Sequence, residues 1–500
     1  MYNPRRHDFP MISIRDVWNR DTRKHLVLAL FFGLLLRLFF VLYLPALDID
    51  SVLYEQLGRN MVVNHAYVYN SGAALIPTAA RVPGYPLFLG VLYIFFGDSQ
   101  RAILIAQAFV DLGTCVMLAM LAASVAPEAS RKRVTIAALW LGATCPFVAN
   151  YAAVALTEVL ATFSSTAAIL LFVWAYQSEF EPSAGARKPR PGQLWFLGGV
   201  IVGLGSLVRP EVPITLAAPA VVLAVKWCKP ANWPRLVRTG LLLAAGTLIS
   251  LLPWAARNWV TLHQAQFLTT RYFHLSGAYI PVGFYAWTHT WLVSYYYVDT
   301  VVNQLEEGPL NITDFPAYAF DSPAERARVE TLLEDQHKNS FVFSPQADAQ
   351  FSELARERTV RHPLRTYLTV PFLRSLTLWF NPRTELLPDA SNWWPPIRDW
   401  GDYDWDFAVA SLFVVLNFFY VGLALAGAYR MRRECGVALL AAFIVTRTLF
   451  IAMEHSTVEP RFVVPCVPAV LALGALVWAR RRECIPGRRQ AEAAREAHTI

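Results

Sequence analysis

The stretch Leu26–Pro45 reads LVLALFFGLLLRLFFVLYLP and carries a single charged residue, Arg37. About 20 apolar residues in a helix cross the roughly 30 Å hydrocarbon core of a bilayer, so this stretch predicts a membrane-spanning helix. It is too long for the apolar part of a cleavable signal peptide, and the segment 1–25 before it is polar and basic. We therefore expect it to be retained as the first of several spans.

The composition of the whole chain supports an all-α polytopic membrane protein. Of its 500 residues, 55% are hydrophobic and only 16% are charged, whereas soluble proteins carry about 25% charged residues. The run 84–97 is too short to span and suits a re-entrant or juxtamembrane helix. Together with 26–45, the predicted spans lie near 102–124, 134–150, 158–177, 193–208, 212–228, 237–256, 408–428, 436–453 and 462–479.

Basic residues are distributed asymmetrically between the loops that these ten spans would create. The segments 1–25, 125–133, 178–192, 226–238, 429–435 and 480–500 hold 6, 3, 3, 4, 3 and 6 Lys plus Arg, and all fall on one side if the spans alternate. Such segments face the cytoplasm, so we expect both termini to be cytoplasmic, in a plasma (inner) membrane. This distribution also argues against nucleic acid as the partner of a chain with net charge +7.

Two sizeable segments then face outward, 46–101 and 257–407. The second contains an amphipathic stretch, Tyr367–Phe380, and aromatic residues that are typical of a membrane interface, namely Tyr295–Tyr297, Trp379, Trp393 and Trp394. We find no readable specificity code in it.

The first external segment places carboxylates at the membrane rim. Asp48 and Asp50 follow the first span directly, and the sequence Arg81-Val-Pro-Gly-Tyr-Pro comes about thirty residues later. A carboxylate there could accept the proton of an attacking hydroxyl, and Arg81 could hold a phosphate because guanidinium matches its geometry. Alternatively, the two aspartates only cap a helix that begins near Ser51.

Further charged residues are expected at the same side. Glu158 follows Thr157 and begins the fourth span. It is either a residue that the helix dipole favours at an N-terminus or a second carboxylate facing the same cavity. In the second case it could help to bind a metal or position the acceptor. Arg209 and Glu211 lie between the fifth and sixth spans, where they either pair with each other or contribute a phosphate site.

The ends of later spans add to this set. Arg257 ends the seventh span beside Trp254 as an interfacial anchor or a phosphate ligand. His455, Glu459 and Arg461 precede the last span on the same side. All these candidates lie at helix ends on one face of the membrane, which suits a reaction between a membrane-held donor and an external acceptor.

Two arginines, Arg37 and Arg447, fall within spans, where a charge is either functional or paired with a neighbouring carboxylate. Transporter sites lie near the midplane of the membrane, and only these two residues qualify for such a site. A flippase or transporter of lipid-linked saccharides therefore stays as the alternative function, and a scaffold or receptor with an external ligand-binding loop is a further one.

The order of these motifs resembles glycosyltransferase family 39 of the GT-C superfamily, the group with protein O-mannosyltransferases and the aminoarabinose transferase of lipid A. The resemblance covers about residues 20–480. The motifs are Asp50-Ser-x-x-Tyr54, Arg81-x-Pro-Gly-Tyr85-Pro, Thr157-Glu158, Arg209-Pro210, Pro253-Trp254-x-x-Arg257-Asn258 and Arg461-Phe462-x-x-Pro465-x-x-Pro468.

The resemblance implies a GT-C fold with about 10–13 transmembrane helices, a seven-helix catalytic module over 26–256, a large external loop region over 257–407 and C-terminal spans over 408–479. It implies a polyprenyl-phosphate sugar donor, a hydroxyl acceptor that the sequence does not identify, and inversion at the anomeric carbon. No cofactor is implied with certainty, and a divalent metal is left open.

The resemblance also suggests roles for single residues. Asp50 matches the expected base best, with Asp48 as the other choice, and Glu158 matches a second acidic position. Arg81 stands where several relatives carry Lys, and Phe462 replaces a Tyr. Arg81, Arg209, Arg257 and Arg461 are the expected ligands of the donor phosphate, and Tyr54, Tyr85, His455 and Glu459 are expected to line the substrate pocket.

Overall fold

The structure is a computed structural model that describes residues 20–180, 190–269, 279–338, 342–387 and 404–480. Within these ranges the fold is almost entirely helical, with a single two-stranded antiparallel sheet. Most of the basic segments 1–25 and 480–500, and also Trp393 and Trp394, lie outside the described residues.

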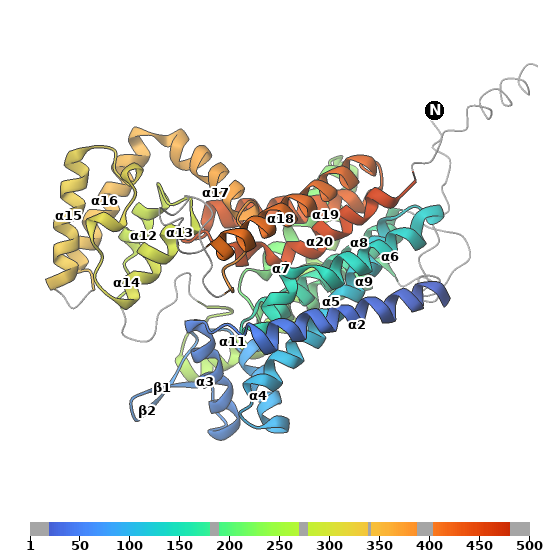
Figure 1. The fold of residues 1–500 in the computed structure, drawn as a ribbon, viewed down its shortest axis with the longest axis horizontal. Helices are drawn as coiled ribbons and strands as arrows, with labels where there is room; N and C mark the ends of the chain where they lie inside the picture. Colours follow the sequence, from blue (N-terminus) through green and yellow to red (C-terminus); the bar gives the residue numbers. More distant parts are fainter. Residues whose placement is uncertain (1–19, 181–189, 270–278, 339–341, 388–403, 481–500) are drawn as a thin grey trace, which may run out of the picture.

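Long apolar helices lie side by side in a bundle (Figure 1). Seven segments of the described chain are long and apolar enough to cross a membrane. They are α2 (Arg20–Tyr43), α5 (Gln100–Val125), α8 (Glu158–Phe180), α11 (Trp233–Leu262), α18 (Asp404–Arg430), α19 (Cys435–Glu454) and the run of η9 (Pro460–Cys466), α20 (Val467–Ala475) and η10 (Leu476–Trp478). The chain is therefore a multi-pass integral membrane protein.

A further apolar segment is bent, in the manner of a broken span or a re-entrant loop. After η1 (Glu128–Ser130), α6 (Arg131–Thr144) meets α7 (Pro146–Ala149) and η2 (Asn150–Ala153) at an angle of 52°. Pro146 stands at the bend, where its missing N–H and its ring interrupt a regular helix.

The remaining two predicted spans are helical but short. α9 (Pro191–Ser206) has 16 residues, and η3 (Val212–Leu216) continues into α10 (Ala217–Lys226) before η4 (Pro230–Asn232). At 1.5 Å per residue α9 measures about 24 Å, which is less than the hydrocarbon thickness. The turn between these short helices carries Arg209, which is 7% exposed.

Glycine allows α9 and α11 to pack closely. A Cβ on Gly199 would lie 2.3 Å from the carbonyl oxygen of Leu243, and one on Gly203 would lie 2.4 Å from that of Thr247. This spacing of two small residues four apart lets helix backbones approach each other in a membrane. The Thr247 hydroxyl also donates to the carbonyl of Gly199 across the contact, at 3.1 Å.

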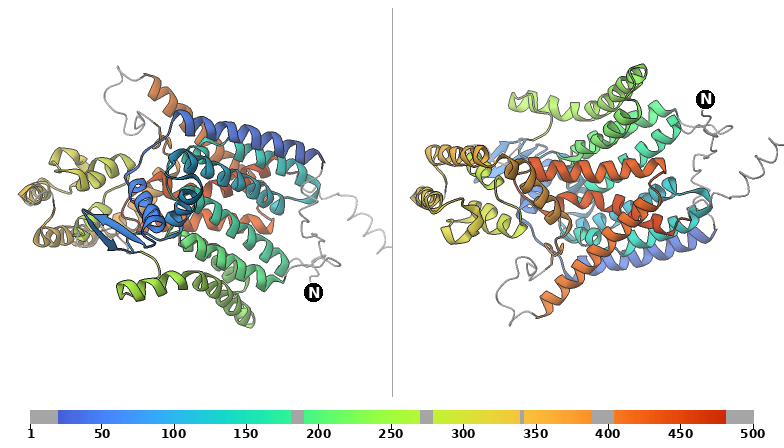
Figure 2. Two further views of the ribbon diagram at one scale, coloured as in Figure 1. Left: turned by 90° about the horizontal axis from the view of Figure 1, so that it is seen from below. Right: turned by 90° about the horizontal axis from the view of Figure 1, so that it is seen from above.

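The first segment predicted to be external folds as α3 (Ile49–Val63), the hairpin of β1 (Val68–Ser71) and β2 (Ala74–Pro77), and the 13-residue α4 (Gly84–Phe96). These elements gather beside the end of the bundle (Figures 1 and 2). The Gly84 N–H donates to the carbonyl of Leu207 at 2.6 Å, and a Cβ on Gly84 would lie 2.5 Å from that oxygen. Gly84 thus allows the segment that follows Arg81 to contact the end of α9.

The second segment predicted to be external forms a helical unit at the same end of the bundle (Figure 1). Its own core contains Phe284, Trp287, Trp291 and Phe351. Its elements are α12 (Val282–His289), α13 (Tyr295–Tyr297), η5 (Val298–Asn303), α14 (Gln304–Glu307), η6 (Ile312–Asp314), η7 (Ala317–Ala319), α15 (Pro323–Lys338), α16 (Pro345–Arg361), η8 (Arg365–Thr369) and α17 (Val370–Trp379). The predicted amphipathic stretch Tyr367–Phe380 corresponds to the end of η8 together with α17.

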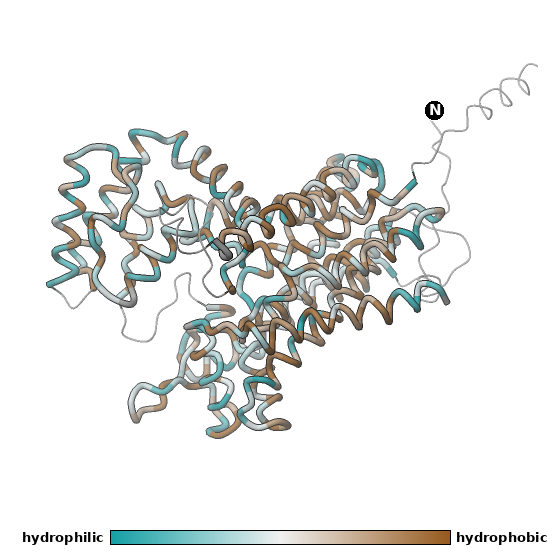
Figure 3. The backbone as a smooth tube through the Cα atoms, in the orientation of Figure 1, coloured by the Kyte–Doolittle hydropathy of each residue, from teal (hydrophilic) through white to brown (hydrophobic). Residues whose placement is uncertain are grey.

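The hydropathy of the chain follows this division. Apolar residues dominate along the bundle, and polar residues are frequent in the α12–α16 unit (Figure 3). Inside the bundle, Arg37 is fully buried and its guanidinium lies 2.6 Å from a carboxylate oxygen of Asp111. The sequence left two interpretations of Arg37 open, a functional charge or a charge paired with a carboxylate. The structure shows the second.

Candidate active site at one end of the bundle

Asp48 and Asp50 open α3, just beyond the end of α2. Asp48 is the N-cap of α3, and its carboxylate accepts the backbone N–H of Asp50 at 2.8 Å. Asp50 instead pairs through Oδ1 with the guanidinium of Arg81. The capping interpretation is therefore correct for Asp48, whereas the side chain of Asp50 faces the arginines.

Arg461 reaches this pair from the far end of the chain. Its Nη1 lies 3.4 Å from Oδ2 of Asp50 and 3.6 Å from Oδ2 of Asp48. Its Nε lies 2.5 Å from Oε2 of Glu459. We call Asp48, Asp50, Arg81, Glu459 and Arg461 the outer charge group; it is partly exposed, because Arg81 and Asp50 keep 19% and 27% of their side-chain surface accessible.

A second charge group lies deeper. Glu158, 1% exposed, pairs with Nη1 of Arg209, and Nε of Arg209 lies 3.1 Å from Glu211. Nε2 of His455 lies 3.9 Å from the carboxylate of Glu211. We call Glu158, Arg209, Glu211 and His455 the inner charge group.

Burial and pairing oppose each other in the inner charge group. Burial by itself lowers the pKa of Arg209, but the carboxylates of Glu158 and Glu211 more than compensate, so that this pKa is raised. Burial would raise the pKa of Glu211, and Arg209 together with His455 lowers it overall. Both side chains therefore stay charged, which suits ions that are buried as pairs rather than singly.

The ring of Phe462 separates the two charge groups. The guanidinium carbon of Arg209 lies 5.2 Å from the ring centroid and that of Arg461 lies 5.6 Å from it. The His455 ring packs on Phe462 with centroids 4.0 Å apart. Thr457 bridges the two groups, because its hydroxyl donates to Glu459 of the outer group at 2.8 Å and lies 3.2 Å from Nδ1 of His455 of the inner group.

The two predicted pocket tyrosines lie under the outer charge group. Arg81 sits over the Tyr54 ring, 5.5 Å from its centroid, and Tyr54 packs edge-on against Tyr85 at 5.2 Å. Burial raises the pKa of Tyr54 to about 12, although Arg81 opposes this shift. Tyr85 is fully buried and its hydroxyl donates to Gln107 at 2.7 Å. As placed, Tyr85 supports Tyr54 and is not itself accessible to a substrate.

Arg257 lies apart from both charge groups. Its Nη1 donates to the carbonyl of Thr78 and its Nη2 to that of Tyr67, each at 2.7 Å, and it packs on the rings of Tyr67 and Trp254. In this arrangement Arg257 ties the first external segment to the end of α11. Its predicted role as a phosphate ligand has no geometric support in the structure.

The structure adds residues that the sequence reasoning did not select. The Tyr151 hydroxyl donates to Glu385 at 2.6 Å. Tyr295, expected only as an interfacial aromatic, has a raised pKa because of burial first and then the charges of Glu459 and Glu385. Nothing in the stretch around Glu385 distinguishes it from an ordinary polar loop.

Arg447 is buried and holds backbone rather than a carboxylate. Its Nε donates to the carbonyl of Phe462 at 2.7 Å, and its Nη1 lies 3.5 Å from the carbonyl of Glu211. This arginine therefore fixes the start of η9, from which Arg461 projects.

The described residues contain no group of three or more His, Cys, Asp and Glu side chains placed to hold a metal ion. The carboxylates of Asp50, Glu158 and Glu459 each contact a guanidinium instead. As placed, these residues do not fit a metal site, and participation of a divalent metal stays an untested prediction.

Comparisons with known proteins show the fold. No family model and no curated protein sequence matches the chain. Among solved structures, it is similar to the archaeal oligosaccharyltransferase AglB from Archaeoglobus fulgidus in complex with an inhibitory peptide and a dolichol-phosphate, with 16% identity, a TM-score of 0.50, and coverage of 96% of this chain and 54% of that one. It is also matched to ArnT from Cupriavidus metallidurans bound to undecaprenyl phosphate, with 13% identity, a TM-score of 0.39, and coverage of 90% and 77%.

The chain thus spans about half the length of the oligosaccharyltransferase. The predicted fold class, an all-α polytopic membrane protein with the GT-C fold, is confirmed. The described chain is almost entirely helical with seven apolar spans, and it shares its fold with the oligosaccharyltransferase. Membership of family 39 in particular stays a prediction.

Proposed function

We propose that this GT-C chain is a membrane glycosyltransferase that transfers a sugar from a polyprenyl-phosphate donor to a hydroxyl acceptor. The observation that carries the proposal is the outer charge group, in which Asp50 contacts both Arg81 and Arg461. A carboxylate beside two guanidiniums places a proton acceptor next to a site for a phosphate leaving group. In support, the oligosaccharyltransferase of the same fold was solved with a dolichol-phosphate.

The proposed reaction is a single displacement with inversion. Asp50 removes the proton of the acceptor hydroxyl, the oxygen bonds to the anomeric carbon, and the bond between that carbon and the phosphate oxygen breaks. The polyprenyl phosphate leaves with the electron pair, and Arg81 and Arg461 stabilise its charge. Asp48 is the weaker candidate for the base because one of its oxygens already caps α3.

Glu158 and Arg209 have a supporting role in this proposal. Both are almost fully buried, and they pair with each other. The guanidiniums of Arg209 and Arg461 both lie against the ring of Phe462, through which the inner charge group would help to position Arg461.

We further propose that the site faces outward from the plasma membrane and that both termini are cytoplasmic. The basic residues between spans support this orientation. A membrane-impermeant thiol reagent tests it, because exposed Cys228 lies between α10 and α11, at the expected cytoplasmic side. Labelling of Cys228 in inverted vesicles but not in intact cells is expected; the reverse pattern would invert the topology.

The activity test compares two neighbouring carboxylates. The purified protein is reconstituted in liposomes with polyprenyl-phosphate donors that carry radiolabelled sugars, and transfer to membrane and protein acceptors is measured. Asp50→Asn is expected to lower transfer by about 10²–10⁴-fold, the usual contribution of a general base. Asp48→Asn is the matched control and should keep most of the activity, because Asn caps a helix as well as Asp does.

Three other outcomes are informative. Full activity in Asp50→Asn together with loss in Asp48→Asn would make Asp48 the base. Full activity in both variants would exclude both aspartates as the base. Movement of the donor across the bilayer without transfer would instead support a flippase.

A further inference from the structure

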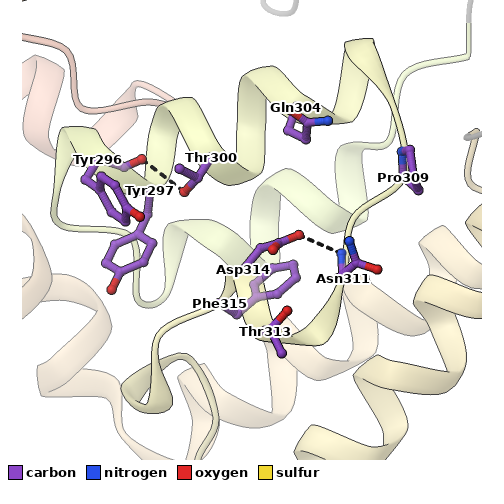
Figure 4. A pocket seen from close by; sticks show the side chains of 9 residues that line it. All are labelled: Tyr296, Tyr297, Thr300, Gln304, Pro309, Asn311, Thr313, Asp314 and Phe315. Atoms are coloured by element: carbon purple, nitrogen blue, oxygen red, sulfur yellow. Dashed lines mark hydrogen bonds between the residues drawn. The ribbon is translucent and has the colours of Figure 1, made fainter. Parts of the chain in front are cut away.

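The α12–α16 unit carries a half-open cavity at its surface, and none of its lining residues belongs to either charge group. Its volume is about 460 Å³, within the range of about 300–1,000 Å³ that small-molecule sites occupy. One wall is the helical run through α13, η5 and α14, and the other is the turn that leads into and past η6 (Figure 4). The lining residues are Tyr296, Tyr297, Thr300, Gln304, Pro309, Asn311, Thr313, Asp314 and Phe315.

The lining combines aromatic faces with short polar groups. Tyr296 and Tyr297 are half-buried, and their rings lie 5.0 Å apart in an edge-on arrangement. Hydroxyl and amide side chains of Thr300, Gln304 and Asn311 supply both hydrogen-bond donors and acceptors. A pyranose ring needs this combination, because one of its faces presents C–H groups to an aromatic ring while its rim presents hydroxyls.

The charge of the lining restricts the ligand further. Asp314 carries the one carboxylate among the nine described residues that line it, and none of the nine is basic. One oxygen of Asp314 accepts the backbone N–H of Asn311 at 2.7 Å, which orients the carboxylate beside the cavity. A phosphate or uronate would be repelled by this negative charge, because no cation in the lining compensates it. A neutral or amine-bearing sugar would meet no such repulsion.

The backbone of one wall is also unusual. Val298–Asn303, which contributes Thr300, is a π-helix, and π-helical turns are rare and are frequent at functional sites. Tyr296 lines the cavity and directly follows Tyr295, at the start of the same helical run.

We propose that this cavity binds a saccharide unit that carries no negative charge, and that it holds a sugar of the acceptor, a role that rests on the proposed transferase function. Because the two tyrosine rings are nearly perpendicular, one of them would stack on the sugar ring and the other would contact its edge, and Gln304 and Asn311 would bind its hydroxyls. The same chemistry would recognise a free sugar or the sugar of a larger glycan or glycolipid.

Binding is tested on the full-length protein in detergent micelles by saturation-transfer difference NMR. The probes are N-acetylglucosamine, glucosamine, glucose and glucosamine 6-phosphate. Saturation of the ring protons of one or more of the three non-phosphorylated sugars is expected, with the signal of the phosphorylated sugar at least fivefold weaker. Tyr296→Ala and Gln304→Ala should each reduce the signal at least fivefold.

Matched controls lie next to these positions. Asn303 carries an exposed amide beside Gln304 but does not line the cavity, and Tyr367 is an exposed tyrosine of the same external segment. Asn303→Ala and Tyr367→Ala should keep the wild-type signal. An N-acetylglucosamine disaccharide that binds more tightly than the monosaccharide would point to a glycan as the natural source.

Several results would overturn the proposal. The first is the absence of saturation for all four sugars. The second is an equal signal in Tyr296→Ala and wild type. The third is binding of a Ser/Thr-rich peptide, abolished by the cavity substitutions, while no sugar binds. Sugar transfer without sugar binding would exclude this cavity as a saccharide site and would still support the transferase function. Sugar binding in a protein that transfers nothing would support the cavity and count against the transferase.

Discussion

Asp50 and Arg461 stand 411 positions apart in the chain, yet Nη1 of Arg461 lies 3.4 Å from Oδ2 of Asp50. The first residues after the first span and the first residues of the last span therefore meet in one site. The contact brings the second guanidinium to the carboxylate that Arg81 already contacts. The following predictions test what this site and its supports contribute.

Arg461→Lys is expected to lower sugar transfer by roughly 10-fold or more with little loss of stability. Lysine keeps the charge but cannot contact Asp50 and Glu459 through two nitrogens at once, as Arg461 does. Transfer in proteoliposomes and the melting temperature in detergent are measured together. Arg59→Lys, which alters an exposed pair with Asp98, is the control; equal activity of both variants would contradict the role of Arg461.

Arg461→Met should also change the pH dependence of transfer. Removing a positive charge makes deprotonation of the neighbouring carboxylates harder. If the reaction needs the deprotonated form of Asp48, whose pKa Arg461 lowers, the acidic limb of the pH–rate profile moves to higher pH. An unchanged acidic limb would show that Arg461 does not act on the base.

Asp48→Asn is expected to stabilise the protein at pH 7. Burial raises the pKa of Asp48 above its ordinary value of 3.8, although Arg461 opposes the shift. The folded state therefore binds more protons than the unfolded state between these two pKa values, and stability falls as the pH rises through this window. Asn removes that penalty and keeps the helix cap.

Thermal unfolding in detergent at pH 4 and pH 7 measures this effect. The melting temperature of Asp48→Asn should exceed that of wild type at pH 7, and the difference should shrink towards pH 4. Asp48→Ala loses the cap, which costs about 1 kcal/mol, and should not gain stability. A less stable Asp48→Asn at pH 7 would mean that the contact with Arg461 outweighs the burial of the carboxylate.

Breaking the buried pair of Arg37 and Asp111 should be strongly destabilising. Both side chains are fully buried, and removing one partner leaves an uncompensated charge, at about 3–5 kcal/mol. Arg37→Met and Asp111→Leu should each lower the melting temperature, and the double variant should recover most of the loss. A double variant as unstable as the sum of the two single ones would show that the residues are not coupled.

Arg257→Gln should loosen the first external segment. The guanidinium holds the carbonyls of Tyr67 and Thr78, and hydrogen bonds to charged groups contribute about 1.5–3 kcal/mol. Amide hydrogen exchange over 66–80 should become about tenfold faster or more, with Arg235→Gln, an exposed arginine of the same helix, as the control. Unchanged exchange with loss of transfer would instead support Arg257 as a phosphate ligand.

The spans were predictable because the bilayer imposes a simple rule. A helix must present about 20 apolar residues to lipid, and this pattern is local in sequence. All ten predicted segments are helical in the structure, including α9 and the run of η3 and α10, which are too short to span on their own. Both pack against longer helices, α9 against α8 and α11 and α10 against α19, and hydropathy does not report such packing.

The candidate site was predictable in part. Charged residues at a membrane rim are costly unless they are solvated or used, and this argument led to Asp50, Arg81, Glu158, Arg209 and Arg461, which the structure brings together. The same argument selected Arg257, whose nitrogens hold backbone carbonyls, and it missed Glu385, because polar residues are unremarkable in an external loop.

The sequence by itself determined that the chain crosses the membrane repeatedly, since this follows from the length of its apolar segments. The tertiary structure alone decided that Asp48 caps a helix while Asp50 faces two arginines. Neighbouring residues of the same type differ in these roles because direction and burial are set by contacts with residues hundreds of positions away.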